Sequence, residues 1–165
     1  MNLVLIGFMG SGKTTIGKAL AKRKGLNFID TDIVIENQNN SKIEDIFQNF
    51  GETYFRQLEK QAIDQLLSLD DCVIAVGGGA VMHHDNFDTL KRVGITIFLD
   101  APFQKILINI KGKFRPLVGN TIDENKLCEL FETRYSTYKK ADIIINTEDL
   151  SILQTVDEIV TRLGS

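Results

Sequence analysis

The chain has 165 residues, of which 43% are hydrophobic and 25% charged, a balance that excludes a disordered or fibrous protein and is typical of a single globular domain. Its net charge of −3 excludes the global basic field that recruits nucleic acid or anionic membranes. Any anionic ligand must therefore be held by local arginines, lysines and backbone dipoles.

The chain shows no targeting or membrane-spanning signal. No apolar run approaches the roughly 18 residues needed to cross a bilayer, and the first run, residues 3–6, is too short for a signal peptide. Cys72 and Cys128 lie far apart without C-x-x-C spacing, as expected for two reduced thiols packed as small hydrophobes. We expect a cytoplasmic monomer with no nucleic-acid or membrane partner.

Short apolar runs alternate with longer segments of helical period. Most of the runs are continuous, as in parallel strands that are buried on both faces. The predicted strands are residues 3–6, 27–29, 72–76, 96–99 and 143–145. Joined by right-handed crossovers, they predict one α/β domain over residues 1–165, a three-layer α/β/α fold with a central five-stranded parallel sheet.

The helical segments have recognisable ends. Residues 13–24 should form a helix that Gly25 terminates, residues 52–69 place apolar side chains at helical spacing, and Pro102 suits the first turn of another helix. Three hydroxyl residues precede a Glu or Gln by three positions and predict capping boxes. These residues are Ser41, Thr121 and Ser151.

The loop after the first predicted strand reads Gly-Phe-Met-Gly-Ser-Gly-Lys-Thr from Gly7 to Thr14, which is the P-loop pattern. Its glycines permit positive φ, so that backbone N–H groups can form an anion-binding nest at a helix N-terminus. Lys13 would bridge the β- and γ-phosphates, and the Thr14 hydroxyl would ligate Mg²⁺. The predicted nucleotide-binding residues of the loop are Gly10, Ser11, Gly12, Lys13, Thr14 and Thr15.

A P-loop alone does not identify what accepts the phosphate, because switches, ATPases and kinases share it. Asp30 and Asp32 follow the second predicted strand, at the edge where open α/β sheets bind ligands. In extended chain this spacing points both carboxylates the same way, so that one could hold Mg²⁺ while the other accepts a proton. The alternative is ordinary turn chemistry.

Further candidates have ordinary explanations when taken singly. The glycines at 77–79 permit close approach of a ligand or form a flexible turn, and Arg56 and Arg134 could be surface arginines on helices. Residues 109–121 are polar and basic and include Arg115. This segment is either a solvated loop or a mobile lid.

Taken together and in order, these features resemble the shikimate kinases over nearly the whole chain. The shared motifs are the P-loop, Asp30-Thr31-Asp32, Phe55-Arg56 with Glu59, Gly77-Gly78-Gly79, Arg115-Pro116-Leu117, and Arg134 with Tyr135 and Tyr138. The resemblance implies a P-loop kinase fold with a substrate-binding helical segment at about 31–61 and a mobile lid at about 109–121. It also implies transfer of the γ-phosphoryl of ATP to the 3-hydroxyl of shikimate, on the path to chorismate and the aromatic amino acids.

The resemblance also implies roles for individual residues. Shikimate would be held by Asp32, Arg56, Gly78, Gly79 and Arg134, with the two guanidinium groups facing its carboxylate. Phe47 and Phe55 would wall its ring, and Asp30 would join Thr14 at Mg²⁺. The catalytic residues would be Lys13, Asp32 as the base, and Arg115, which would close over the γ-phosphate and exclude water.

The sequence departs from the family near the adenine. Ile108 stands where an arginine is common, and residues 146–151 lack a proline, so the adenine contacts stay open, with Lys111 or Lys113 as substitutes. A gluconate kinase-like enzyme is one alternative, but it should lack the combined motif set. A regulatory nucleotide-binding module is another, and against it the chain has no guanine-reading Asn-Lys-x-Asp sequence.

Overall fold

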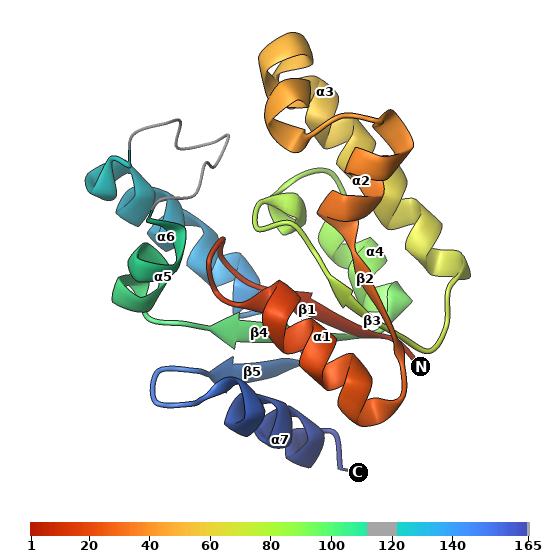
Figure 1. The fold of residues 1–165 in the computed structure, drawn as a ribbon, viewed down its shortest axis with the longest axis vertical. Helices are drawn as coiled ribbons and strands as arrows, with labels where there is room; N and C mark the ends of the chain where they lie inside the picture. Colours follow the sequence, from red (N-terminus) through yellow and green to blue (C-terminus); the bar gives the residue numbers. More distant parts are fainter. Residues whose placement is uncertain (112–121, 165) are drawn as a thin grey trace.

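A single parallel sheet forms the centre of the protein. The structure, a computed structural model, describes residues 1–111 and 122–164. In these ranges five strands pair in the order β2-β3-β1-β4-β5 (Figure 1). They are β1 (Leu3–Ile6), β2 (Asn27–Asp30), β3 (Cys72–Ala75), β4 (Ile95–Asp100) and β5 (Ile143–Asn146). All pairings are parallel, and each predicted strand is confirmed to within one residue at either end.

Helices cover both faces of this sheet (Figure 1). They are α1 (Lys13–Lys24), α2 (Thr31–Asn39), α3 (Ile43–Gln65), α4 (Asn86–Val93), α5 (Phe103–Ile110), α6 (Glu124–Tyr138) and α7 (Ile152–Arg162), with short 3₁₀ turns η1 (Leu66–Ser68) and η2 (Ala80–Met82). Helices α1 and α7 pack against each other on one face. Helices α3 to α6 bury their apolar side chains against the other face, and α2 packs on α3. The three-layer prediction is confirmed.

Side chains along β1 alternate between the two faces of the sheet, and both faces must be covered by helices because all of these side chains are apolar. Leu3 and Leu5 belong to the core beneath α1 and α7, whereas Val4 and Ile6 belong to the core on the opposite face. All four side chains are essentially inaccessible, as expected for a central strand of a parallel sheet.

The predicted helix ends are right at two places. Gly25 ends α1 in the left-handed conformation with φ 68° and ψ 30°, where a Cβ would be unfavourable. Ser151 opens α7 with the predicted capping box, in which its hydroxyl accepts from the Gln154 amide and the Gln154 side chain accepts from the Ser151 amide.

The other two predicted caps are wrong. Helix α3 begins after Lys42 rather than Ser41, because the carboxylate of Glu36 on α2 accepts from the Ile43 amide and takes over the capping role. Helix α6 is capped by Asp123, whose carboxylate accepts from two backbone amides of the first turn. Thr121, the predicted cap, lies outside the described residues.

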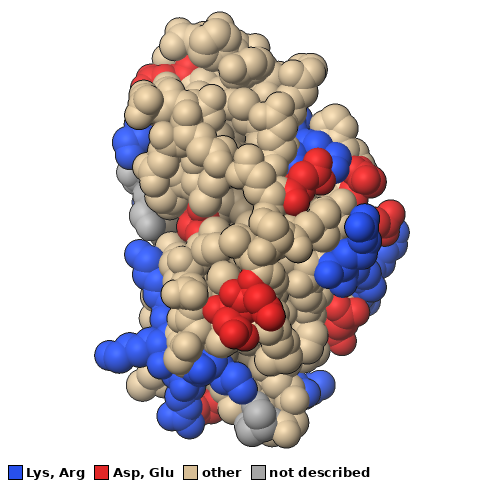
Figure 2. Space-filling view, turned by 90° about the vertical axis from the view of Figure 1, so that its right-hand side faces the viewer, with Lys and Arg blue, Asp and Glu red and all other residues tan. Residues whose placement is uncertain are grey.

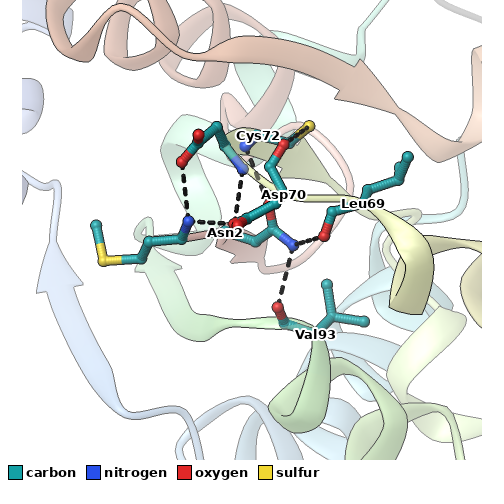
Figure 3. Close-up of polar contacts among 7 residues, drawn as sticks. Asn2, Leu69, Asp70, Cys72 and Val93 are labelled. Atoms are coloured by element: carbon teal, nitrogen blue, oxygen red, sulfur yellow. Dashed lines mark hydrogen bonds and ion pairs between the residues drawn. The ribbon is translucent and has the colours of Figure 1, made fainter.

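A buried asparagine fastens the amino ends of the central strands (Figure 3). The Asn2 amide nitrogen donates to the carbonyls of Leu69 (2.7 Å) and Val93 (3.2 Å), and its side-chain oxygen accepts from the Cys72 amide (3.0 Å). Asn2 thereby joins the start of β1 to the segments that lead into β3 and β4. This arrangement fixes the relative positions of the strands whose opposite ends carry the candidate site.

Figure 2 shows how charge is distributed on one face of the molecule. Acidic and basic side chains alternate at its right edge, lysine and arginine side chains gather at its lower left, and its upper end carries few charges. Among the described residues, no helix is long and apolar enough to cross a membrane.

Candidate active site

The candidate site lies at the carboxyl ends of β1 and β3, which are neighbours in the sheet. The chain leaves β1 toward α1 on one face and leaves β3 toward η2 and α4 on the other face. Such a divergence opens a crevice where open α/β sheets bind ligands. Two adjoining cavities of about 450 and 560 Å³ occupy it.

The P-loop forms one end of the smaller cavity. Gly7, Gly10 and Gly12 have φ of 152°, 76° and 94°, values that side chains rarely allow, and Gly12 precedes the first turn of α1. All six predicted loop residues, from Gly10 to Thr15, line this cavity. The geometry suits an anion at the positive end of the α1 dipole.

Two P-loop side chains are already held in place. The Lys13 ammonium donates to the carbonyls of Gly7 (2.7 Å) and Phe8 (2.9 Å), and the Thr14 hydroxyl donates to the Asp30 carboxylate (2.8 Å). The structure thus brings together Thr14 and Asp30, which come from different parts of the chain. Hydroxyl and carboxylate oxygens are ligands that suit Mg²⁺.

The Asp30 and Asp32 side chains share the site, but the extended geometry predicted for them is wrong. Asp30 ends β2 and caps α2, where its carboxylate accepts from the Asp32 amide (3.0 Å). Asp32 therefore stands in the first turn of a helix, because the cap starts that helix at Thr31. Both carboxylates nevertheless line both cavities.

The larger cavity brings together the residues predicted to bind the acceptor. Asp32, Arg56, Arg134 and the glycine run at 77–79 all line it, and so do Phe47 and Phe55, whose ring centroids lie 4.7 Å apart. The two cavities share Met9, Thr14, Asp30, Asp32, Gly77 and Gly78. Ligands in the two cavities would meet at these residues.

Both arginines of the larger cavity are buried, at 5% and 4% exposure, so the surface interpretation is wrong for each. The Arg56 guanidinium donates to Glu59 (2.8 Å) and more weakly to the half-exposed Glu52 (3.4 Å). The two guanidinium groups converge on Gly79. A Cβ built there would lie 2.7 Å from Arg56 Nη2 and 2.8 Å from Arg134 Nη2.

The buried charges at this point do not balance. Arg56 and Arg134 face one fully buried carboxylate, Glu59, which also lies near Asp32, since both approach the Cβ position of Gly77 within about 3.1 Å. Burial raises the pKa of Glu59 to about 7 although Arg56 opposes this shift, and burial lowers the pKa of Arg134. Among the described residues, Arg56 Nε and Arg134 Nη1 have no hydrogen-bond partner. Uncompensated guanidinium donors suit a carboxylate ligand.

The backbone of the glycine run is supported from two sides. The Tyr138 hydroxyl donates to the Gly78 carbonyl, and burial raises the pKa of this hydroxyl to about 12. A Cβ on Gly78 would lie 3.0 Å from the Met9 amide nitrogen, so the glycine run and the P-loop touch. Glycine is required here for close approach rather than for an unusual backbone angle.

Some of the predicted site lies elsewhere or cannot be placed. Arg115, Lys113 and most of the predicted lid fall outside the described residues, and the start of that segment, Asn109 and Ile110, belongs to α5. Ile108 is 72% exposed and does not line either cavity. Lys105 and Thr147 line the smaller cavity but were not predicted as site residues from the sequence. Thr147 directly follows β5, and residues at the carboxyl end of a parallel strand are candidates for ligand binding.

The strand order, the P-loop and the adjoining arginine-lined cavity define a P-loop kinase. A model of the shikimate kinase family matches residues 9–164. The chain belongs to the shikimate kinase family.

Individual relatives agree with this assignment. The chain is 44% identical over 163 residues to a shikimate kinase of Persephonella marina, covering 98% of both chains, and 42% identical over 160 residues to one of Caldanaerobacter subterraneus, covering 96% of this chain and 94% of the relative. Among solved structures, it matches the shikimate kinase of Acinetobacter baumannii in complex with shikimate, with a TM-score of 0.94 and 34% identity over 99% of this chain and 92% of that one. A gluconokinase of Sinorhizobium meliloti, at 15% identity and a TM-score of 0.63 over 99% of this chain and 91% of that one, shares the fold alone.

Proposed function

We propose that this protein transfers the γ-phosphoryl group of ATP to the 3-hydroxyl of shikimate. The observation that carries the proposal is the convergence of two buried guanidinium groups, Arg56 and Arg134, on Gly79 in the cavity that adjoins the P-loop. A small ring acid with one carboxylate and several hydroxyls would supply the negative charge that balances these two buried guanidinium groups.

The donor end of the proposal rests on the P-loop. The triphosphate would lie along the backbone from Gly10 to Thr15, at the N-terminus of α1. The Lys13 ammonium would exchange its two carbonyl partners in the loop for phosphate oxygens. Its positive charge would then offset the charge that develops on the transferred group.

Mg²⁺ fits the residues present. Thr14 and Asp30 would hold it, since their side-chain oxygens already lie 2.8 Å apart beside the phosphate end of the cavity. When bound, the ion would neutralise phosphate charge and orient the phosphoryl group.

At the acceptor end, we assign the carboxylate of the substrate to Arg56 and Arg134, with Gly78 and Gly79 presenting backbone alongside. Asp32 would accept the proton of the 3-hydroxyl as its oxygen bonds to the γ-phosphorus. The bond from that phosphorus to the bridging oxygen breaks, and ADP leaves. The position of Asp32 supports this role, because Asp32 lines both cavities and donor and acceptor would meet there.

Three parts of the proposal rest on the family resemblance. Arg115 would close over the γ-phosphate as part of a lid at about 109–121, residues 31–61 would form the acceptor-binding segment, and the protein would work as a cytoplasmic monomer. Pocket-lining residues of α2 and α3, such as Asp32 and Phe55, support the second part.

A coupled assay of ADP release tests the proposal. Shikimate, gluconate, a nucleoside monophosphate and no acceptor would be offered separately, with ATP and Mg²⁺. We expect turnover that depends on shikimate. Equal ADP release with and without shikimate would contradict the kinase assignment, and a preference for gluconate would transfer the proposal to the gluconate kinase alternative.

A further inference from the structure

The two arginines of the larger cavity differ in how their buried charges are compensated. Arg56 pairs with the carboxylates of Glu59 (2.8 Å) and Glu52 (3.4 Å), whereas no carboxylate of the described residues forms an ion pair with Arg134. Burial lowers the pKa of the Arg134 guanidinium, and the neighbouring Tyr138 only partly opposes this shift. Because a buried charge without a partner is costly, another group must stabilise Arg134.

The Phe8 ring is placed to stabilise this charge. The guanidinium carbon of Arg134 lies over the ring, 5.6 Å from its centroid, within the range in which the negative face of an aromatic ring attracts a cation. Phe8 is 1% exposed, and this attraction is stronger for a pair that is shielded from water. Phe8 belongs to the P-loop, so a residue of the phosphate-binding segment contacts an arginine proposed to bind the acceptor.

Helix α6 fixes the position of the Phe8 ring. Phe8 makes an edge-to-face contact with Phe131, with a centroid separation of 5.4 Å and an interplanar angle of 81°. Phe131 and Arg134 are three residues apart on α6 and project from the same side of that helix, so the ring packs against both. Phe131 in turn contacts Phe103 at 5.5 Å and Tyr135 at 5.7 Å. The ring beside Arg134 is therefore part of a packed aromatic cluster.

The ring stabilises the charge of Arg134 without occupying its hydrogen-bond donors. Arg134 Nη1 has no partner among the described residues, and Nη2 lies 2.8 Å from the Cβ position of Gly79. A carboxylate partner within the protein would take up such donors. A guanidinium that rests on an aromatic face instead keeps them for a ligand.

The backbone of Phe8 contacts the donor side of the site. Its carbonyl accepts from the Lys13 ammonium (2.9 Å) and from the Ser11 amide (3.2 Å). The main chain of this residue thus meets the lysine proposed to bind phosphate, while its side chain meets the arginine proposed to bind the acceptor. Phe8 lines neither cavity, so its side chain acts through Arg134.

We propose that Phe8 is a positioning residue that holds the Arg134 guanidinium in place for the carboxylate of the acceptor. This inference rests on the proposed function, which puts that carboxylate between Arg56 and Arg134. The ring compensates the buried charge, keeps the guanidinium beside Gly79 and leaves its donors to the ligand. The P-loop thereby contributes to acceptor binding as well as to phosphate binding.

Fluorination of the Phe8 ring tests the attraction between charge and ring. Phenylalanine analogues with one, two and three ring fluorines would replace Phe8, because fluorine withdraws electron density from the ring face and changes the size of the ring little. Titration calorimetry would give the Kd for shikimate and the Kd for ATP. We expect the Kd for shikimate to rise with each fluorine, by about 2- to 30-fold for three, and the Kd for ATP to stay within about twofold.

The same series at Phe87 is the matched control. The Phe87 ring lies 5.4 Å from the Lys91 ammonium, so it makes the same kind of contact, but neither residue lines the two cavities of the candidate site. Fluorination of Phe87 should leave both Kd values unchanged.

NMR of the ligand-free protein measures the contact without any acceptor. The side-chain Nε–Hε signal of Arg134, assigned by its loss in Arg134→Lys, should be shifted upfield by the ring current of Phe8. Phe8→Leu keeps an apolar side chain but has no ring, so it should remove this shift.

Three results would overturn the proposal. They are a Kd for shikimate that stays constant along the Phe8 series, an equal rise in the Kd for ATP or in the Phe87 series, and an Arg134 signal that Phe8→Leu leaves unchanged. A parent protein that shows the shifted Arg134 signal but does not bind shikimate would contradict the proposed acceptor and support the contact between Phe8 and Arg134.

Discussion

Replacing Gly79 by alanine should separate acceptor binding from stability. Gly79 has φ −91° and ψ −4°, which alanine adopts without strain. The added methyl would instead lie 2.7 Å from Arg56 Nη2 and 2.8 Å from Arg134 Nη2, inside van der Waals contact. Both clashing atoms are the far ends of long side chains, so the protein can relax by moving the guanidinium groups.

That movement occurs where the proposed carboxylate binds. Hydrogen bonds to charged groups contribute about 1.5–3 kcal/mol each, so the loss of one guanidinium contact corresponds to about a 10- to 150-fold weaker acceptor. Folding should change little, because alanine restricts the unfolded chain and contributes about 0.4–1 kcal/mol, which offsets part of the displacement.

The measurement is the KM for shikimate beside the Kd for ATP and the free energy of unfolding in urea. Gly25→Ala is the contrasting control: its Cβ meets nothing within 4 Å, but its φ of 68° is left-handed, so it should lose about 1–2 kcal/mol of stability with normal kinetics. If Gly79→Ala binds shikimate like the parent, the carboxylate does not lie between the two arginines.

Four further substitutions probe the donor loop, the buried charges and the scaffold. Lys13→Ala should lower kcat at least about 100-fold with shikimate still bound in a titration; near-normal turnover would contradict the role of the loop. Tyr138→Phe removes the donor to the Gly78 carbonyl and should cost about 1 kcal/mol in urea unfolding and raise the KM for shikimate several-fold; an unchanged KM would show that this bond does not support the site. Asn2→Ala removes three bonds (Figure 3) and should cost about 3 kcal/mol in thermal unfolding without changing kcat; a stability equal to the parent's would refute the fastening role. Burial raises the pKa of Glu59 from 4.5 to about 7, so the unfolded chain loses this proton at lower pH than the folded protein does. The stability that protonated Glu59 contributes is therefore fully present below about pH 4.5 and is lost as the pH rises toward 7. Glu59→Gln should lack this part of the decrease in the free energy of unfolding, and parallel pH profiles for variant and parent would refute the prediction.

The sequence predicts the sheet and the P-loop well because their signals are local. Continuous apolar runs mark β1 and β3, and the P-loop pattern needs only eight consecutive residues. Ser151 is a good cap prediction for the same reason. Ser41 fails because the competing carboxylate, Glu36, comes from a preceding helix, and spacing along one helix cannot reveal that contact.

Prediction of the site depends on contacts between distant segments. Arg56 and Arg134 look like helix-surface arginines on their own, and only the fold buries both beside Gly79. The family resemblance, rather than periodicity, brought them together in advance. Thr147 was missed although it directly follows a predicted strand, because only the fold shows that the carboxyl end of β5 borders the same cavity as the P-loop.

The contact between the P-loop and the glycine run has a consequence for how such an enzyme changes its substrate. Met9 and Gly78 touch beyond the carboxyl ends of β1 and β3, whereas the arginines proposed to bind the acceptor come from α3 and α6. Selection or design can therefore exchange the helical side chains for a new acceptor and keep the central loops untouched. We expect libraries confined to α3 and α6 to retain ATP binding while their acceptor preference diverges.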